Sequence, residues 1–162
     1  DAENVNDSNN TINDNSNEAN GDSILEKVKE NYPIEGILMI DKIDLKLPIL
    51  TDATENNMKI SVASIKGTGK PGQIGNYSIA GHRSHTYGRN FNRLNEVKAG
   101  DLIKVDDGNE QFSYEVTEKL YVKPDEVWVL ESNGIDKEIT LVTCHPMINP
   151  THRLIIKGKI KE

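Results

Sequence analysis

From Ile34 onward the chain alternates short apolar runs with Gly, Pro, Asn and Asp, and this pattern limits the possible fold more than any other feature of the sequence. Eight runs have this character: residues 35–42, 44–50, 75–82, 101–107, 112–122, 127–130, 138–144 and 153–160. Apolar and polar residues alternate within 112–122, and no long helical pattern lies between the runs. Short strands at such regular spacing predict a mostly β domain, built as an antiparallel or mixed barrel or sandwich.

Two short helices are expected beside these strands. Residues 23–33 carry apolar side chains at helical spacing, with Ser23 as a possible N-cap and Pro33 as the stop. A second short helix is expected after Thr54, and the rest of 54–76, rich in Gly and polar residues, is expected to form loops.

The first 22 residues differ in composition from the rest of the chain. They contain eight Asn and six acids with almost nothing to bury, so we expect residues 1–22 to be a disordered acidic linker before a folded domain at 23–162. The whole chain has a formal net charge of −7, and the linker supplies −6 of it, which leaves about −1 for the domain. A nearly neutral domain lacks the Lys/Arg field that phosphate backbones require, so nucleic acid is not expected as a partner.

The single cysteine, Cys144, is the first candidate for chemistry. A thiol becomes an effective nucleophile when a base or positive charge favours its thiolate, because a free thiol has a pKa of roughly 8.5. The candidate partners are four histidines and one arginine, namely His82, His85, His145, His152 and Arg153. Neighbouring side chains on a strand point to opposite faces, so His145 is a poor partner if the strand of Cys144 continues through it.

The strand that carries Cys144 is expected to end beside Pro146, next to a loop where a rigid scaffold can expose a functional side chain. Arg153 begins the next predicted strand, which could pair beside Cys144. A free cysteine in an apolar strand is more often an inert small hydrophobic residue than a nucleophile. The residues taken singly therefore leave both interpretations of Cys144 open.

Several segments together resemble the sortase family in their order and approximate spacing. They are "SIAGH" at 78–82, "FNRL" at 91–94 followed by "AGD" at 99–101, "TLVTC" at 140–144 and "RLIIKG" at 153–158. The resemblance extends to "GILMIDKIDLKLPIL" at 36–50 and to "GKPGQIGNYSIAGHR" at 69–83, and it covers about 34–160.

This resemblance implies a closed, sortase-type eight-stranded β-barrel with a few short helices and the activity of a cysteine transpeptidase. By the same resemblance, Cys144 matches the nucleophile, His82 the general acid/base, and Arg153 the arginine that orients the substrate or stabilises the oxyanion. Thr143 matches the residue before the cysteine and is assigned to substrate binding.

The family also implies partners and a location. Sortases cleave an LPxTG-like sorting signal of secreted surface proteins through a thioacyl enzyme and transfer the protein to a cell-wall precursor amine. The expected location is the outer face of a Gram-positive cell membrane, with anchoring by an N-terminal helix that is absent from this chain. The nine-residue step from Cys144 to Arg153 and the "THRL" at 151–154 resemble pilin-type and class D or E members more than class A members. The N-terminal segment shows no acidic-aromatic lid motif of the pilus-assembling kind, which argues against pilus polymerisation, so a class D-like member is favoured.

No cofactor is expected, and four well-spaced zinc ligands are not evident. Calcium stays open as an alternative, because some sortases use it and Asp106, Asp107 and Glu110 offer oxygens, although "DDGNE" is also a typical solvated turn. Two other functions stay open as well: a cysteine hydrolase with the same three residues, and an extracellular β-barrel binding module with an inert core cysteine.

Overall fold

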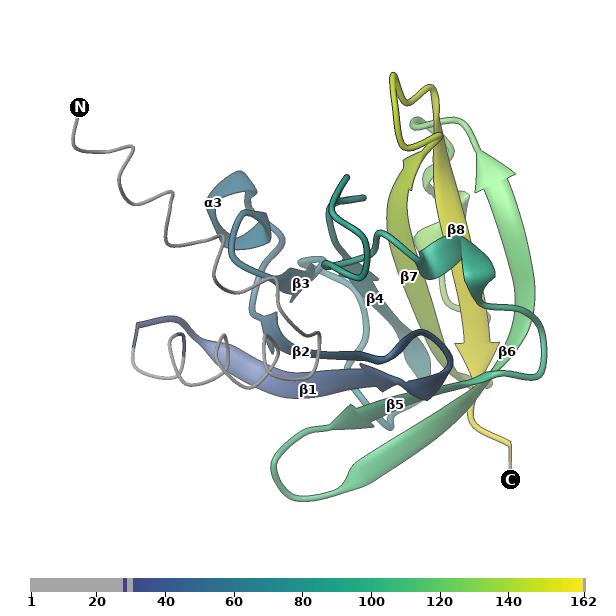
Figure 1. Ribbon diagram of the computed structural model, residues 1–162. Coiled ribbons are helices and arrows are strands. Elements are labelled where there is room, and N and C mark those ends of the chain that lie inside the picture. Colours follow the sequence, from purple (N-terminus) through teal and green to yellow (C-terminus); the bar gives the residue numbers. More distant parts are fainter. Residues whose placement is uncertain (1–27, 29–30, 162) are drawn as a thin grey trace.

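Eight strands close into a barrel in the order β1-β2-β3-β4-β7-β8-β6-β5 in the computed structural model, which describes residue 28 and residues 31–161 (Figure 1). The strands are β1 Ile34–Ile40, β2 Leu45–Leu50, β3 Val62–Ser64, β4 Gly75–Ala80, β5 Leu102–Asp106, β6 Gln111–Val122, β7 Lys137–His145 and β8 His152–Lys159. Between them lie single helical turns, η2 Asp41–Ile43, α3 Glu55–Met58, η3 Leu94–Glu96 and η4 Val127–Leu130. The expected closed eight-stranded barrel with a few short helices is confirmed.

The N-terminal predictions are outside this description. The expected linker at 1–22 and seven of the eleven residues of the expected helix at 23–33 fall on residues that the structure does not describe. The second expected helix is present as α3, where the Thr54 hydroxyl accepts a hydrogen bond from the Asn57 N–H at 3.1 Å, as an N-cap residue should.

Most neighbouring strands are antiparallel, but β2–β3 and β4–β7 are parallel. The parallel pairing of β4 with β7 matters most for function, because it brings the C-terminal ends of both strands to the same end of the sheet. β8 then pairs antiparallel with β7 along its whole length, so its first residues lie at that same end. In Figure 1 this end is at the top, where the loop between β7 and β8 projects from the barrel.

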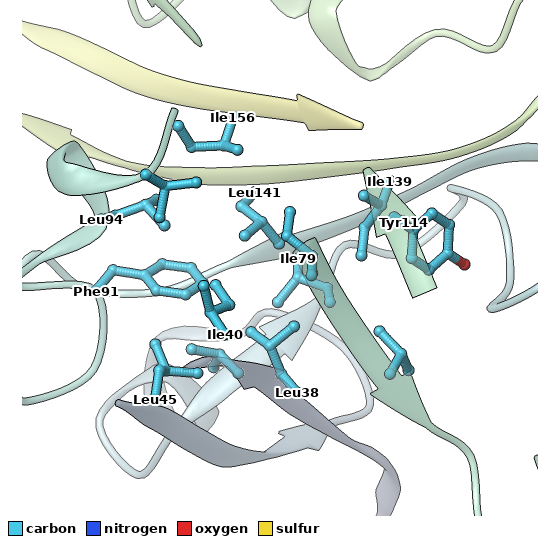
Figure 2. Close-up of a cluster of buried hydrophobic side chains, with 14 of the residues drawn as sticks. Leu38, Ile40, Leu45, Ile79, Phe91, Leu94, Tyr114, Ile139, Leu141 and Ile156 are labelled. Carbon is cyan, nitrogen blue, oxygen red and sulfur yellow. The ribbon is translucent and has the colours of Figure 1, made fainter. Parts of the chain in front are cut away.

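The inner face of the barrel holds the main hydrophobic core, shown in Figure 2. Ile79 of β4, Leu141 of β7 and Ile156 of β8 are fully buried there, together with Phe91 and Tyr114. The positions of Ile79, Leu141 and Ile156 follow the two-residue period of a strand, which sends every second side chain inward. Full burial of one such apolar side chain is worth roughly 1.5–3 kcal/mol, so this layer fixes the strand register.

A second apolar cluster covers the outer face of β7 and β8. Its structure shows that one prediction was wrong. Residues 127–130 were expected to form a strand, but they form η4, whose Val129 packs with Val122 and Ile155. An apolar run of four residues fits either a strand or one helical turn, so local pattern cannot separate them. The outer face of the sheet beneath residues 127–130 determines their conformation, because a helical turn packed across that face buries Val129.

Side-chain hydrogen bonds hold η4 in place. The Lys157 ammonium donates to the Val129 carbonyl at 2.6 Å and to the Thr140 hydroxyl at 3.0 Å. The Asn76 amide donates to the carbonyls of Val129 and Glu131 at 3.0 and 3.1 Å. Burial lowers the pKa of Lys157, which is the cost of placing an ammonium under this turn.

β3 is the strand that the sequence did not predict. It has three residues, and it pairs in parallel with β2 through Ile49–Val62 and antiparallel with β4 through Ala63–Ala80. Its length is too short for a visible alternation, and all three residues are buried. The strand exists because two longer strands present unpaired edges on either side of it, a tertiary cause that local sequence does not contain.

Candidate active site

Cys144 is the penultimate residue of β7 and is half-buried. Thr143, one residue earlier, is only 2% exposed and points inward, as do Leu141 and Ile139 of the core. Alternation along the strand therefore sends Cys144 to the outer face of the barrel, away from the core. This placement corresponds to the expected strand end next to a loop, because β7 stops at His145, just before Pro146.

Arg153 stands directly opposite Cys144 in the antiparallel pairing of β7 with β8. Side chains of directly opposed residues leave the same face of a sheet, with Cβ atoms about 4.5–5.5 Å apart. The Arg153 Nη1 group donates to the carbonyl of His152 at 3.2 Å. A guanidinium has five N–H donors, and within residues 31–161 no second hydrogen bond of Arg153 is found, so donors remain for a substrate oxygen.

His82 lies level with Cys144 at the end of the neighbouring strand. The last register pair of β4 and β7 joins Ala80 to Val142, and the Gly81 N–H continues the ladder by donating to the Val142 carbonyl at 3.1 Å. His82 follows Ala80 by two residues, as Cys144 follows Val142. The structure thus brings the three residues expected to be catalytic to adjacent strand ends on β4, β7 and β8.

The Thr143 hydroxyl links the strand ends of β4 and β7. It donates to the Gly81 carbonyl at 2.8 Å, so the residue before Cys144 is bonded to the residue before His82. Because Thr143 is buried and its hydroxyl is used in this bond, the side chain joins the two strand ends. Its assignment to substrate binding stays a prediction.

The His82 imidazole reaches solvent, with 42% of the side chain exposed, and its Nε2 lies 3.9 Å from a Glu55 carboxylate oxygen on α3. The main chain of His82 is held from the other side, where the Phe91 N–H donates to its carbonyl at 3.2 Å. An accessible imidazole on an anchored backbone can exchange protons with a bound substrate. Glu55 was not predicted as part of the site, since only the fold brings α3 to the end of β4.

Gly81 makes this strand end possible. A Cβ atom at this position would lie 2.8 Å from side-chain atoms of both Phe91 and Val62, closer than side chains approach each other. Only a glycine lets the chain pass between these two core residues immediately before His82.

Arg83 is a residue of the site that the sequence analysis did not identify. Its Nη1 donates to the carbonyl of Cys144 at 3.0 Å, its Nε to the carbonyl of Asn92 at 2.9 Å and its Nη2 to the side-chain oxygen of Asn95 at 3.0 Å. Burial lowers the pKa of Arg83, while Tyr121 and Cys144 act in the opposite direction. The available signal was its position, because it directly follows His82.

The other three histidines have different surroundings. His145 belongs to β7, and alternation directs it away from Cys144; its ring lies against Tyr121 at 4.4 Å between centroids. Burial, with Arg83 and His152 nearby, lowers the pKa of His145. His85 Nε2 is 3.2 Å from the Met147 carbonyl, and His152 Nδ1 is 2.8 Å from the Thr151 hydroxyl.

The acidic residues considered for calcium form a hairpin turn between β5 and β6. Asp106 accepts a hydrogen bond from the Gly108 N–H, and one Asp107 oxygen accepts from the N–H groups of Asn109 and Glu110, each within 2.9 Å. These backbone donors lower the pKa of Asp107. Across residues 31–161 no group of three or more His, Cys, Asp or Glu side chains is placed to hold a metal ion. Calcium dependence stays untested.

A cleft of about 500 Å³ opens beside Glu35 and the loop at 65–71, but none of the expected catalytic residues line it. The Glu35 carboxylate accepts hydrogen bonds from the hydroxyls of Thr51, Ser64 and Tyr77 at 2.9, 3.1 and 2.5 Å. These bonds tie β1 to β3, to β4 and to Thr51, the residue that follows β2. We therefore assign this cluster to the stability of the barrel, and not to the site around Cys144.

The fold and the three strand ends define a β-barrel protein with a candidate cysteine active site, and comparison with known proteins gives its family. A family model described as "Sortase domain" matches residues 38–161. Sortase A of Bacillus anthracis is 34% identical over 125 residues, which are 77% of this chain and 59% of that protein. Sortase D of Bacillus subtilis (strain 168) is 29% identical over 133 residues, which are 80% of this chain and 65% of that protein.

Solved structures agree with this match. The crystal structure of sortase C1 from Streptococcus agalactiae is similar with a TM-score of 0.75 and 31% identity, over 80% of this chain and 68% of that one. Sortase A from Corynebacterium diphtheriae gives a TM-score of 0.77 and 26% identity, over 85% and 65% of the two chains. The chain belongs to the sortase family.

The similar proteins belong to more than one class of sortase. Sortases named A, C and D are all similar to this chain, so the class D-like assignment stays a prediction. The chain spans 59% and 65% of the two curated relatives described above. Among the helices of the described residues, none is long and apolar enough to span a membrane.

Proposed function

We propose that this protein is a cysteine transpeptidase that anchors surface proteins, with Cys144 as nucleophile, His82 as general acid/base and Arg153 as the group that binds the substrate oxyanion. The observation that carries the proposal is the direct pairing of Cys144 with Arg153 across β7 and β8, level with His82 at the end of β4. Membership of the sortase family supports the role of a cysteine transpeptidase in surface protein anchoring.

In the first half-reaction the Cys144 thiolate attacks the carbonyl carbon of the scissile peptide bond. A C–S bond forms, the C–N bond breaks, and His82 gives a proton to the leaving amine, which leaves a thioacyl enzyme. The accessible imidazole of His82 suits this proton transfer. The guanidinium of Arg153 lies on the same face as the thiol, where it can donate hydrogen bonds to the negative charge on the carbonyl oxygen.

In the second half-reaction an incoming amine attacks the thioacyl carbon. His82 accepts the proton of this amine, an amide C–N bond forms, and the Cys144 thiolate is released. The proposed substrates are an LPxTG-like sorting signal of a secreted surface protein and the amine of a cell-wall precursor. The proposed location is the outer face of a Gram-positive cell membrane, anchored through a segment N-terminal to this chain.

The test is a panel of sorting-signal peptides with varied second, third and fifth positions, each incubated with and without an added amine such as triglycine. We expect cleavage of LPxTG-like peptides and an amide product that contains the amine. The peptide preference also tests the class D-like assignment. Cys144→Ala is the control, and it should remove cleavage and transfer while the barrel stays folded, because the change deletes one sulfur atom at a strand end.

The two competing functions predict other results. A cysteine hydrolase would release only the free acid even at high amine concentration. A binding module with an inert cysteine would show no cleavage, and its Cys144 would resist iodoacetamide until the protein unfolds. We also propose that no metal takes part, so turnover should be equal in EDTA and in millimolar calcium.

A further inference from the structure

We propose that Arg83 is a positioning residue of this site, which holds the Cys144 main chain through its guanidinium and so joins the nucleophile strand to the strand end that carries His82. The inference rests on the proposed role of Cys144 as nucleophile. It adds a second arginine to the site, with a function different from that of Arg153.

The first argument is the course of the ladder between β4 and β7. In a parallel pair, every second N–H of one strand donates to every second carbonyl of the other. The Gly81 N–H donates to the Val142 carbonyl at 3.1 Å, so the next bond of this ladder would run from the main chain of residue 83 to the Cys144 carbonyl. β4 has already ended at Ala80, and the Arg83 side chain supplies this bond instead, at 3.0 Å.

The second argument is that all three guanidinium nitrogens of Arg83, namely Nε, Nη1 and Nη2, donate hydrogen bonds. Besides the bond to Cys144, Nε donates to the Asn92 carbonyl at 2.9 Å and Nη2 to the Asn95 side chain at 3.0 Å. A planar fork held at three points has little freedom to rotate, so it fixes the Cys144 carbonyl in space. An ammonium on a flexible stem cannot reproduce this geometry.

The third argument is that one partner of Arg83, Asn92, is buried and is itself held by hydrogen bonds. Asn92 is 5% exposed, its amide donates to the Ser84 carbonyl at 2.6 Å, and its side-chain oxygen accepts from the Gly88 N–H at 3.0 Å. The same amide lies 3.7 Å from the Met147 sulfur, in the loop that follows Cys144. The connection after His82 and the loop after Cys144 therefore form one packed unit around the Arg83 guanidinium.

For catalysis, the consequence is that Arg83 fixes the relative positions of His82 and Cys144. Arg83 is covalently next to His82 and hydrogen-bonded to Cys144, so a single side chain links the main chains of the proposed acid/base and nucleophile. A misplacement of reacting groups by about 1 Å can cost about a hundredfold in rate. Because the guanidinium contacts the Cys144 carbonyl and not a substrate-facing group, its loss should reduce kcat far more than it changes KM.

The experiment compares Arg83→Gln with Arg93→Gln in the peptide transfer assay. Arg93 is a matched control in the same connection: its guanidinium bonds Glu96 at 2.9 and 3.1 Å and the Ile43 carbonyl at 3.3 Å, with no bond to Cys144. We expect Arg83→Gln to lower kcat by about a hundredfold with nearly unchanged KM. Arg93→Gln should lower Tm yet keep kcat near that of the wild type.

Two further variants make the result specific. Arg83→Lys should stay as slow as Arg83→Gln, because the charge without the fork does not hold the carbonyl. Arg83→Ala should regain part of its kcat when guanidinium or methylguanidinium is added, whereas Cys144→Ala should not. If Arg83→Gln does not fold, Asn95→Ala removes one anchor of the fork and should lower kcat with a small effect on Tm.

The inference is overturned if the wild type transfers peptide and Arg83→Gln keeps its kcat, or if Arg93→Gln loses kcat to the same degree. Recovery of full activity in Arg83→Lys, or a normal kcat in a folded Asn95→Ala, would overturn it as well. Failure of the proposed function gives a different result, because it is seen in the wild type itself. If the wild type neither cleaves nor transfers the peptide, this inference fails with the proposed function. If the wild type only hydrolyses the peptide, the same variants are compared by their kcat for cleavage, and the outcomes above decide the inference in the same way.

Discussion

Cys144 and Arg153 are directly opposed residues of an antiparallel strand pair, although eight residues lie between them in the chain. Strand pairing thus places the two residues next to each other on the same face of the sheet, and both backbone positions lie within regular strands. Both side chains leave the outer face of the sheet, whose inner face is packed into the barrel core through Leu141 and Leu154. Because both backbone positions are fixed by the sheet, single substitutions can test what the thiol and the guanidinium each contribute to turnover.

Arg153→Lys separates charge from geometry. If Arg153 binds the oxyanion through paired N–H donors, the lysine variant loses this geometry while it keeps the positive charge. We expect turnover to fall by about a hundredfold to a thousandfold, which corresponds to roughly 2.7–4 kcal/mol for loss of an oxyanion donor. The rate of Cys144 alkylation by iodoacetamide, measured in parallel, should change much less. An alkylation rate that falls in step with turnover would instead assign Arg153 to activation of the thiol.

His82→Ala should reduce turnover far more than alanine at any of the other three histidines. General acid/base catalysis is typically worth about 10²–10⁴-fold, so we expect a loss in that range for His82. The single variants at His85, His145 and His152 are the comparison, with Tm measured for each so that unfolding is not mistaken for loss of catalysis. An equal loss at His145 or His152 would instead assign the proton transfer to that histidine, at the facing ends of β7 and β8.

Gly81→Ala should destabilise the barrel and slow the enzyme together. The new methyl group would meet Phe91 and Val62 at 2.8 Å, and overpacking of this kind costs about 1–3 kcal/mol. Because His82 is the next residue, we also expect a clear fall in kcat. Gly108→Ala is the control: its φ of +98° is unfavourable for alanine, but open space surrounds it in a distant hairpin, so stability should fall without a change in kcat.

His145 should make stability depend on pH between about 5 and 7. Its folded-state pKa is lowered by burial, by Arg83 and by His152, and its ring contacts Tyr121, so the unfolded chain binds a proton more readily than the folded one. The free energy of unfolding should therefore fall as the pH drops below the ordinary histidine pKa of about 6.5. His145→Phe keeps a ring against Tyr121 and should lessen this fall. Denaturant unfolding of both proteins at pH 5.5 and pH 8 measures it, and identical losses would contradict the prediction.

Much of the fold could be predicted from local pattern. Short apolar runs separated by Gly, Pro, Asn and Asp predicted seven of the strands, and alternation of apolar and polar residues supported the prediction in β6. The prediction failed at 127–130, where four apolar residues form η4, and at β3, which has only three residues. In both places the conformation depends on a neighbouring surface that the local sequence does not describe.

The sequence alone determined which residue types are available for chemistry and the family that their order resembles, since Cys144, His82 and Arg153 can be found by chain position. Tertiary structure decided how these residues stand to one another, through the parallel pairing of β4 with β7 and the antiparallel pairing of β7 with β8. It also decided the role of Arg83, whose bond to the Cys144 carbonyl spans 61 positions of the chain. Strand periodicity is a local property that can be read along the chain, whereas register and long-range hydrogen bonds arise only when the barrel closes and its core packs.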